Sequence, residues 1–288
     1  MIPDPIVDAH HHVWDLSVRD QPWLIGEALE PIRRSFTLAD LESEAATTGV
    51  TSTVLVQTIA VAAETPEFLA FAAASPLVAG VVGWVDLTAP DVADTIDSLR
   101  GLPGGEKLVG IRHPVQDEAD PDWLLRPDVS RGLAAVAAAG LTYDLLIRPP
   151  QFPAAVQAAA ALPGLAFIVD HLGKPPIAAG ELHPWAKDIN ALAALPNTVC
   201  KLSGVVTEAD WQAWSPHDLY PFAETALQAF GPDRLMFGSD WPVCLLAASY
   251  EDVVNAARTL TGSLSPAERA AVFAGTATRV YGLTEGNR

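Results

Sequence analysis

Short apolar runs alternate with longer amphipathic segments along the whole chain. Short runs bounded by turn residues are typical of buried strands, whereas longer periodic segments are typical of helices. The predicted strands are Pro5–His12, Ser52–Thr58, Val78–Asp86, Lys107–His113, Leu141–Arg148, Leu165–His171, Thr198–Ser203 and Leu235–Asp240. The predicted helices are Leu38–Thr48, Pro66–Ala74, Pro90–Arg100, Asp128–Ala139, Gln151–Ala161, Pro184–Leu195, His217–Phe230, Tyr250–Thr261 and, at the end, Pro266–Ala274.

The order of these elements predicts a single α/β domain over residues 1–288. Strands that alternate with helices imply a parallel sheet with right-handed crossovers. Eight such units close into a (β/α)8 TIM barrel. A doubly wound sheet is the alternative, but no glycine-rich phosphate-binding loop follows the first predicted strand. In the barrel, the long connection 14–36 would lie over the mouth, where long loops are often functional.

Composition narrows the classes of partner. The 288 residues are 50% hydrophobic and carry a formal net charge of −18, which argues against nucleic acid and anionic membranes, since both need basic patches. No apolar run reaches the length of a membrane span, and Met1–Pro5 has no targeting signal, so we expect a cytoplasmic protein. Cys200 and Cys244 are expected to be buried, reduced thiols. A homodimer and a monomer are equally compatible with the sequence.

Polar residues gather where the predicted strands end. In a TIM barrel, functional residues lie at the carboxyl ends of the strands. These ends carry His10, His11, His12, Gln57, Trp84, Asp86, Arg112, His113, Asp144, Arg148, Asp170, His171, Lys201, Ser203, Ser239, Asp240 and Trp241. The helices contain almost no histidine, so this bias predicts a catalytic site at the mouth of the barrel.

His10 and His12 are two positions apart on a strand, so both face one way and His11 faces the other. In a closed barrel the eighth strand neighbours the first, so Asp240 can reach the same axis. Such a set suits one divalent ion such as zinc, or hydrogen bonds to a substrate oxygen without a metal. His171 is either a further ligand or a donor to the reacting carbonyl. A polar strand end without a role is the alternative.

Two basic residues have more than one interpretation. Arg112 can neutralise a carboxylate or a developing oxyanion, or it can form a structural ion pair with Asp86 or Asp144. Lys201 shares a strand face with Ser203 and can point into the barrel, where a lysine can form a Schiff base as in aldolases.

Most of the tryptophans fall in loops or at strand ends. They are Trp14, Trp23, Trp84, Trp211, Trp214 and Trp241. Such residues form apolar walls or platforms on which a sugar stacks, or they simply pack loops against the barrel. The sequence leaves both interpretations open.

The motifs together resemble a known family. The opening Val7-Asp8-Ala9-His10-His11-His12-Val13-Trp14-Asp15 resembles the DxHxHxW start of amidohydrolase-related proteins. Segments 110–113, 170–175, 201–204 and 237–242 are similar to that family's other signatures, in the same order along nearly the whole chain. Within the amidohydrolase superfamily the chain is most similar to the L-fuconolactonase-like branch, which segment 31–36 also resembles. Members of that branch hydrolyse sugar lactones, and relatives open other lactones.

The resemblance implies lactone hydrolysis in a (β/α)8 barrel. It makes His10, His12, His171 and Asp240 the central polar set, with Arg112 beside them. We expect Asp240 to activate water as the general base, with the other four as further catalytic residues. One divalent ion, held by His10, His12, Asp240 and in one arrangement His171, is an open expectation, because some relatives work without metal. Firmly metal-binding members add a histidine or carboxylated lysine from the fourth or fifth strand. Substrate contacts are expected from Trp14, Trp84, Arg112, His113 and Trp241.

Three alternative functions remain compatible with the same barrel. A metal-dependent decarboxylase, or another hydrolase of the amidohydrolase type, would hold zinc tightly; the decarboxylase would also release CO₂. A Schiff-base aldolase would be trapped by borohydride at Lys201. A sugar-binding barrel without catalysis would show saturable binding and no turnover.

Overall fold

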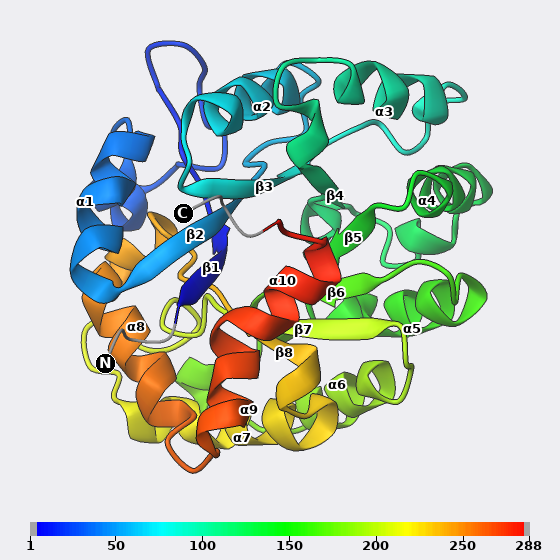
Figure 1. Ribbon diagram of the computed structural model, residues 1–288. Coiled ribbons are helices and arrows are strands. Elements are labelled where there is room, and N and C mark those ends of the chain that lie inside the picture. Colours follow the sequence, from blue (N-terminus) through cyan, green and yellow to red (C-terminus); the bar gives the residue numbers. More distant parts are fainter. Residues whose placement is uncertain (1–4, 285–288) are drawn as a thin grey trace.

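Eight strands pair in the order β1 to β8, and all seven successive pairs are parallel (Figure 1). The computed structural model describes residues 5–284; residues 1–4, in which no targeting signal is predicted, lie outside that range. The strands are β1 Ile6–His11, β2 Val50–Val56, β3 Val78–Gly83, β4 Leu108–His113, β5 Thr142–Leu145, β6 Phe167–Val169, β7 Thr198–Leu202 and β8 Leu235–Phe237. The predicted (β/α)8 barrel is confirmed.

Helices surround the strands and follow them in turn (Figure 1). They are α1 Leu38–Thr48, α2 Glu64–Ala74, α3 Val92–Arg100, α4 Pro127–Ala138, α5 Phe152–Ala161, α6 Trp185–Ala193, α7 Pro216–Phe230, α8 Tyr250–Leu260, α9 Pro266–Ala270 and α10 Thr276–Tyr281. None of the helices within residues 5–284 combines the length and apolarity that a membrane crossing needs.

The first and last strands close the ring through their continuations. The backbone N–H of His12 donates to the carbonyl of Trp241 at 2.7 Å, and that of Asp240 donates to the carbonyl of His10 at 2.8 Å. These bonds continue the parallel ladder beyond β8. Residues that are about 230 positions apart in the chain therefore meet at the carboxyl end of the barrel.

Several strands end earlier than the sequence predicts. β3, β5, β6 and β8 stop before the predicted ends at Asp86, Arg148, His171 and Asp240, and β2 is displaced by two residues toward the amino end. The backbone leaves the extended conformation at His171, with φ 54°, and at Asp240, with φ 59°. A residue in the left-handed backbone conformation cannot continue a strand. The strand ends thus turn into the mouth and aim their polar side chains across it.

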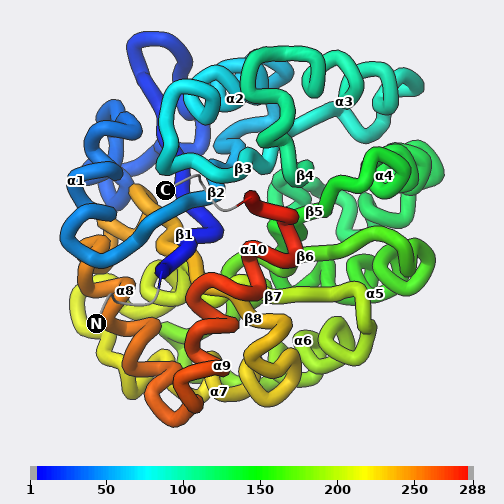
Figure 2. The backbone as a smooth tube through the Cα atoms, in the orientation of Figure 1, coloured from blue at the N-terminus to red at the C-terminus, as the bar shows by residue number. Residues whose placement is uncertain are grey.

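The chain ends differently from the predicted last helix Pro266–Ala274. Helix α9 ends at Ala270, a single π-helical turn spans Ala271–Gly275, and α10 follows. The helix continues because Gly275 keeps helical dihedral angles, with φ −59°. Helix α10 lies across the amino end of the barrel, as the trace also shows (Figures 1 and 2).

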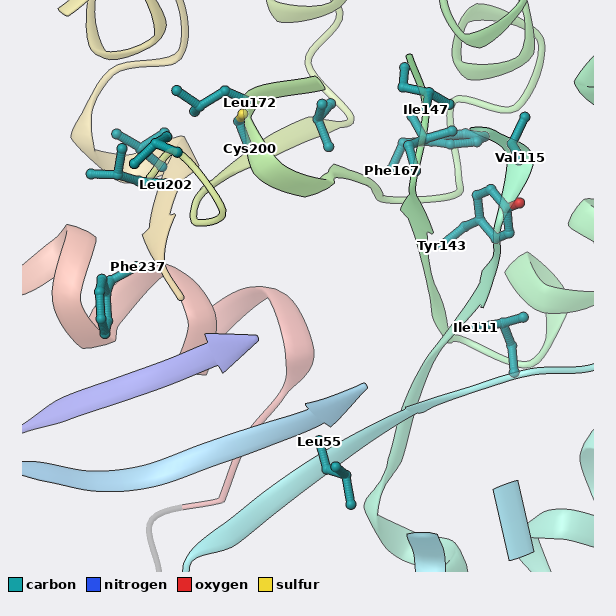
Figure 3. Close-up of a cluster of buried hydrophobic side chains, with 14 of the residues drawn as sticks. Leu55, Ile111, Val115, Tyr143, Ile147, Phe167, Leu172, Cys200, Leu202 and Phe237 are labelled. Carbon is teal, nitrogen blue, oxygen red and sulfur yellow. The ribbon is translucent and has the colours of Figure 1, made fainter. Parts of the chain in front are cut away.

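Alternating strand positions supply two separate apolar layers. Outward-facing residues such as Leu55, Phe167 and Phe237 pack under the helices (Figure 3). Inward-facing residues such as Val54 and Met236 fill the lower barrel and contact α10. Cys200 and Cys244 are free, buried thiols, as predicted. The polar site therefore lies between an apolar floor and the loops of the mouth.

Asp8 links the two ends of the ring and gives a stability prediction. Its carboxylate accepts bonds from the backbone and hydroxyl of Ser239 at 2.8 and 2.6 Å, from Tyr250 at 3.0 Å and from the His10 backbone at 3.1 Å. Asp8→Ala leaves these buried donors unpaired and is expected to lower the free energy of unfolding by about 3 kcal/mol or more. Urea denaturation measures this loss. Tyr250→Phe removes only one donor and should cost about 1 kcal/mol; an equal loss in both variants would contradict the role of Asp8.

Candidate active site

The two histidines of β1 meet inside the barrel. His10 Nε2 and His12 Nε2 are 3.2 Å apart, whereas His11 points away and contacts the Thr53 hydroxyl at 2.9 Å. His12 Nδ1 lies 2.8 Å from the carbonyl oxygen of Val56. A carbonyl only accepts, so Nδ1 carries the proton of neutral His12 and Nε2 presents a lone pair to the site.

Asp240 and His171 complete the centre from β8 and β6. Asp240 Oδ1 lies 3.4 Å from His12 Nε2, 3.7 Å from His10 Nε2 and 3.8 Å from His171 Nε2. Ser203 contacts His171 Nδ1 at 2.9 Å, which orients the ring. None of the four central residues is more than 5% exposed, so they are screened from bulk water.

Burial sets the charge of these groups. It lowers the pKa of His171 to about 4, and burial together with nearby Lys201 holds the pKa of His10 well below its usual range. Both imidazoles are therefore neutral at neutral pH. Burial alone would raise the pKa of Asp240, but its histidine neighbours, His171 first, outweigh burial and lower it. Asp240 is thus an ionised carboxylate at neutral pH.

A buried ammonium lies beneath the histidines. Lys201 Nζ is 2.6 Å from Asp144 Oδ2, 3.0 Å from Asp170 Oδ1 and 3.1 Å from His10 Nδ1, and the side chain has no solvent exposure. Tyr281 of α10 donates to the same Asp144 oxygen at 2.8 Å. The helix that closes the barrel floor is therefore connected to the site through one carboxylate and one lysine.

Arg112 lies in the same network, with a partner that the sequence did not suggest. Its Nη1 contacts Asp170 Oδ2 at 3.1 Å and His10 Nε2 at 3.2 Å, and its Nη2 donates to the Gln57 carbonyl. The proposed ion pairs with Asp86 or Asp144 do not form: Asp86 is exposed and Asp144 is bound to Lys201. Substrate binding by Arg112 stays a prediction.

The donor set fits a divalent ion. Three potential ligand atoms, His10 Nε2, His12 Nε2 and Asp240 Oδ1, lie 3.2–3.7 Å apart, and His171 Nε2 lies 3.8 Å from the Asp240 oxygen. Four ligands about 2.0–2.1 Å from a zinc ion would be separated by about 3.3–3.4 Å. A second group, His10, Asp170 and His171, is also close, but Asp170 is already bound by Arg112 and Lys201.

Trp84 and His113 form a separate cluster on the β3–β4 side of the mouth. Trp84 Nε1 donates to His113 Nδ1 at 3.0 Å, so the proton of neutral His113 lies on Nε2, 2.7 Å from a Glu118 oxygen. The His113 ring stacks on Trp123 with centroids 4.2 Å apart. Both Trp84 and His113 are half-buried, and a sugar contact there stays a prediction.

The other two predicted substrate residues lie deeper. Trp14 is 4% and Trp241 2% exposed, and both pack edge-on against Phe36 with ring centroids 5.4 Å apart. Trp14 also donates to the Arg34 carbonyl at 2.6 Å. These rings hold the long first loop against the barrel, and their contact with substrate remains a prediction.

Strand alternation predicts that Asp170 faces the barrel interior. Ile168 faces the barrel interior, so Asp170, two positions on, faces inward as well. The same alternation applies to Lys201 after Val199. The hydrogen bond between Asp144 and Tyr281 could not be predicted from the local sequence, because it depends on where α10 packs against the barrel.

The comparisons with known proteins identify the family. A profile of the amidohydrolase family matches residues 7–283. The chain is 40% identical over 290 residues to an L-fucono-1,5-lactonase of Burkholderia multivorans (97% of this chain, 96% of the relative) and 39% identical to one of Burkholderia ambifaria (96% and 94%). A crystal structure of an amidohydrolase from Burkholderia multivorans with bound zinc superimposes with a TM-score of 0.92 at 39% identity, over 97% of this chain and 99% of that one. The chain belongs to the amidohydrolase family.

Proposed function

We propose that the protein is a lactonase that opens a sugar lactone by hydrolysis, with L-fucono-1,5-lactone or a related aldonolactone as substrate. The observation that carries this proposal is the convergence of an ionised Asp240 with three histidines in a screened centre. The named relatives at 39–40% identity act on this lactone and cover nearly the whole chain.

In the proposed reaction, Asp240 takes a proton from water as the water oxygen attacks the lactone carbonyl carbon. The bond between that carbon and the ring oxygen then breaks, and Asp240 returns the proton to the ring oxygen. The product is an open-chain hydroxy acid, which ionises and acidifies the solution. An ester needs less assistance than an amide, because its alkoxide leaving group is better than an amine.

The other groups stabilise negative charge that develops on the carbonyl oxygen. His171 and the guanidinium of Arg112 are donors within the same centre, and preorganised donors in a site screened from water lower the barrier. His10, His12 and Asp240 would hold a divalent ion, with His171 beside them. Such an ion, when bound, would polarise the carbonyl as a Lewis acid.

Proton release tests the proposal. The protein is mixed with a panel of aldonolactones and dicarboxylate lactones in weak buffer with a pH indicator, with and without chelator. We expect rapid acidification by L-fucono-1,5-lactone or a close stereoisomer, faster than spontaneous opening. Retained activity in chelator would indicate metal-independent hydrolysis, and lost activity that zinc restores would indicate a required ion. No acceleration with any lactone would overturn the proposal.

The alternative reactions have less support. Neither relative at 39–40% identity is named as a decarboxylase. Lys201, the candidate for a Schiff base, is enclosed and contacts two carboxylates and His10, so its amine has no free path to a carbonyl substrate. The cytoplasmic location and a homodimer remain expectations from the sequence.

A further inference from the structure

The ammonium of Lys201 has three acceptors around it. They are Asp144 Oδ2, Asp170 Oδ1 and His10 Nδ1, at 2.6, 3.0 and 3.1 Å. An ammonium has three N–H donors and accepts nothing. Lys201 donates to Asp144 Oδ2 and His10 Nδ1, and its contact with Asp170 Oδ1 is an ion pair without hydrogen-bond geometry. When Lys201 donates to Nδ1 of His10, that nitrogen holds a lone pair, and the proton of the neutral ring lies on Nε2.

His12, on the opposite side of the His10 ring, favours the same tautomer. His12 presents a lone pair at Nε2, because its Nδ1 proton is given to the Val56 carbonyl. His10 Nε2 lies 3.2 Å from that lone pair. A proton on His10 Nε2 therefore completes an N–H···N hydrogen bond, whereas a proton on Nδ1 would bring two lone pairs face to face.

Metal ligation needs the other tautomer. A divalent ion binds the lone pair of His10 Nε2, so the ring proton must move to Nδ1. From Nδ1 this proton can be donated to Asp170 Oδ1, 3.3 Å away. Lys201 Nζ can then no longer donate to His10 Nδ1. Arg112 only donates, and its Nη1, 3.2 Å from His10 Nε2, favours this second tautomer, so Arg112 opposes Lys201; the other contact of Arg112 Nη1 is Asp170 Oδ2 at 3.1 Å.

We propose that Lys201 is a positioning residue that holds His10 in the Nε2–H tautomer and so weakens the binding of a divalent ion at His10, His12 and Asp240. The lysine thereby sets how far the site depends on metal. This inference goes beyond the proposed lactonase activity, and its tests use no substrate, so it can fail independently of that activity.

The first test measures the tautomer directly. The metal-free, full-length protein is labelled with ¹⁵N-histidine, and the ring signals of His10 are assigned by their loss in His10→Gln. We expect a protonated Nε2 and an unprotonated Nδ1 in the wild-type protein. A His10 ring that carries its proton on Nδ1 would overturn the proposal, and this measurement requires no variant of Lys201.

The second test measures zinc affinity by competition with a fluorescent chelator. Lys201→Met/Asp144→Asn removes one cation and one anion, so the formal charge around the site is unchanged. We expect this double variant to shift His10 to the Nδ1–H tautomer and to bind zinc about 10–100-fold more tightly than wild type, the range seen when residues around metal ligands change. Asp144→Asn alone keeps the Lys201–His10 contact and should bind zinc no more tightly than wild type. Equal zinc affinity in wild type and double variant would refute the proposal.

Discussion

Replacing Asp240 by asparagine is expected to lower kcat about 1,000-fold, within the range that a general base contributes, while KM changes little. The amide has the same size and can still bond to the histidines, but it cannot accept the proton of the attacking water. Asp240 lies within 3.4–3.8 Å of three imidazoles, and within residues 5–284 no other carboxylate contacts all three. Steady-state kinetics with the lactone that acidifies fastest measures the effect.

A matched variant separates chemistry from folding. Asp233→Asn makes the same chemical change at an exposed position and should keep wild-type kinetics. Equal thermal unfolding of Asp240→Asn and wild type would show that the site is intact. Turnover within tenfold of wild type in Asp240→Asn would rule out Asp240 as the base.

Lys201→Met is expected to lower the free energy of unfolding by about 3–5 kcal/mol, because it leaves buried carboxylates without their cation. Asp144 and Asp170 both contact Lys201 and neither is exposed. Adding Asp144→Asn removes one of the two unpaired charges, and Arg112 still neutralises Asp170. The double variant should therefore regain at least half of the lost stability in urea denaturation.

A surface pair gives the contrast for this second prediction. Arg126 and Asp128 are separated by 2.6 Å, the same distance as Lys201 and Asp144, but their side chains are 45% and 31% exposed, whereas those of Lys201 and Asp144 have no exposure. Exposed pairs are screened and contribute little, so Arg126→Met should cost far less than Lys201→Met. Similar losses in the two variants would show that burial is not what makes the Lys201 network important.

The fold was predictable because each strand and helix carries its own pattern. Eight apolar runs separated by amphipathic segments are sufficient to predict a barrel. The ends were less predictable, since His171 and Asp240 adopt left-handed backbone conformations that depend on the surrounding loops. The π-helical turn at Ala271–Gly275 was not predictable for a related reason. A glycine in the sequence indicates the end of a helix, and only packing in the folded protein keeps Gly275 helical.

The site was partly predictable. Alternation on the strand placed His10 and His12 together, as the structure shows. The direction in which the pair faces depends on an irregularity in β1. Val7 and Ala9 face the barrel interior, so regular alternation would make His10 face outward. The β1–β2 register shifts between Asp8 and His11, and His10 therefore faces inward as well. A regular strand would have turned His11 toward the axis. No local pattern in the sequence shows this shift.

The bond between Tyr281 and Asp144 has a consequence for synthesis on the ribosome. The two residues are 137 positions apart, and α10, which closes the barrel floor, is made after all eight strands. At about 5–20 residues per second, roughly 7–27 s separate their synthesis. During that interval the nascent chain contains Asp144 and Lys201 but not yet Tyr281, which donates to Asp144 in the folded protein. The unfinished chain, rather than the completed enzyme, is then the form most open to proteases and most in need of chaperones.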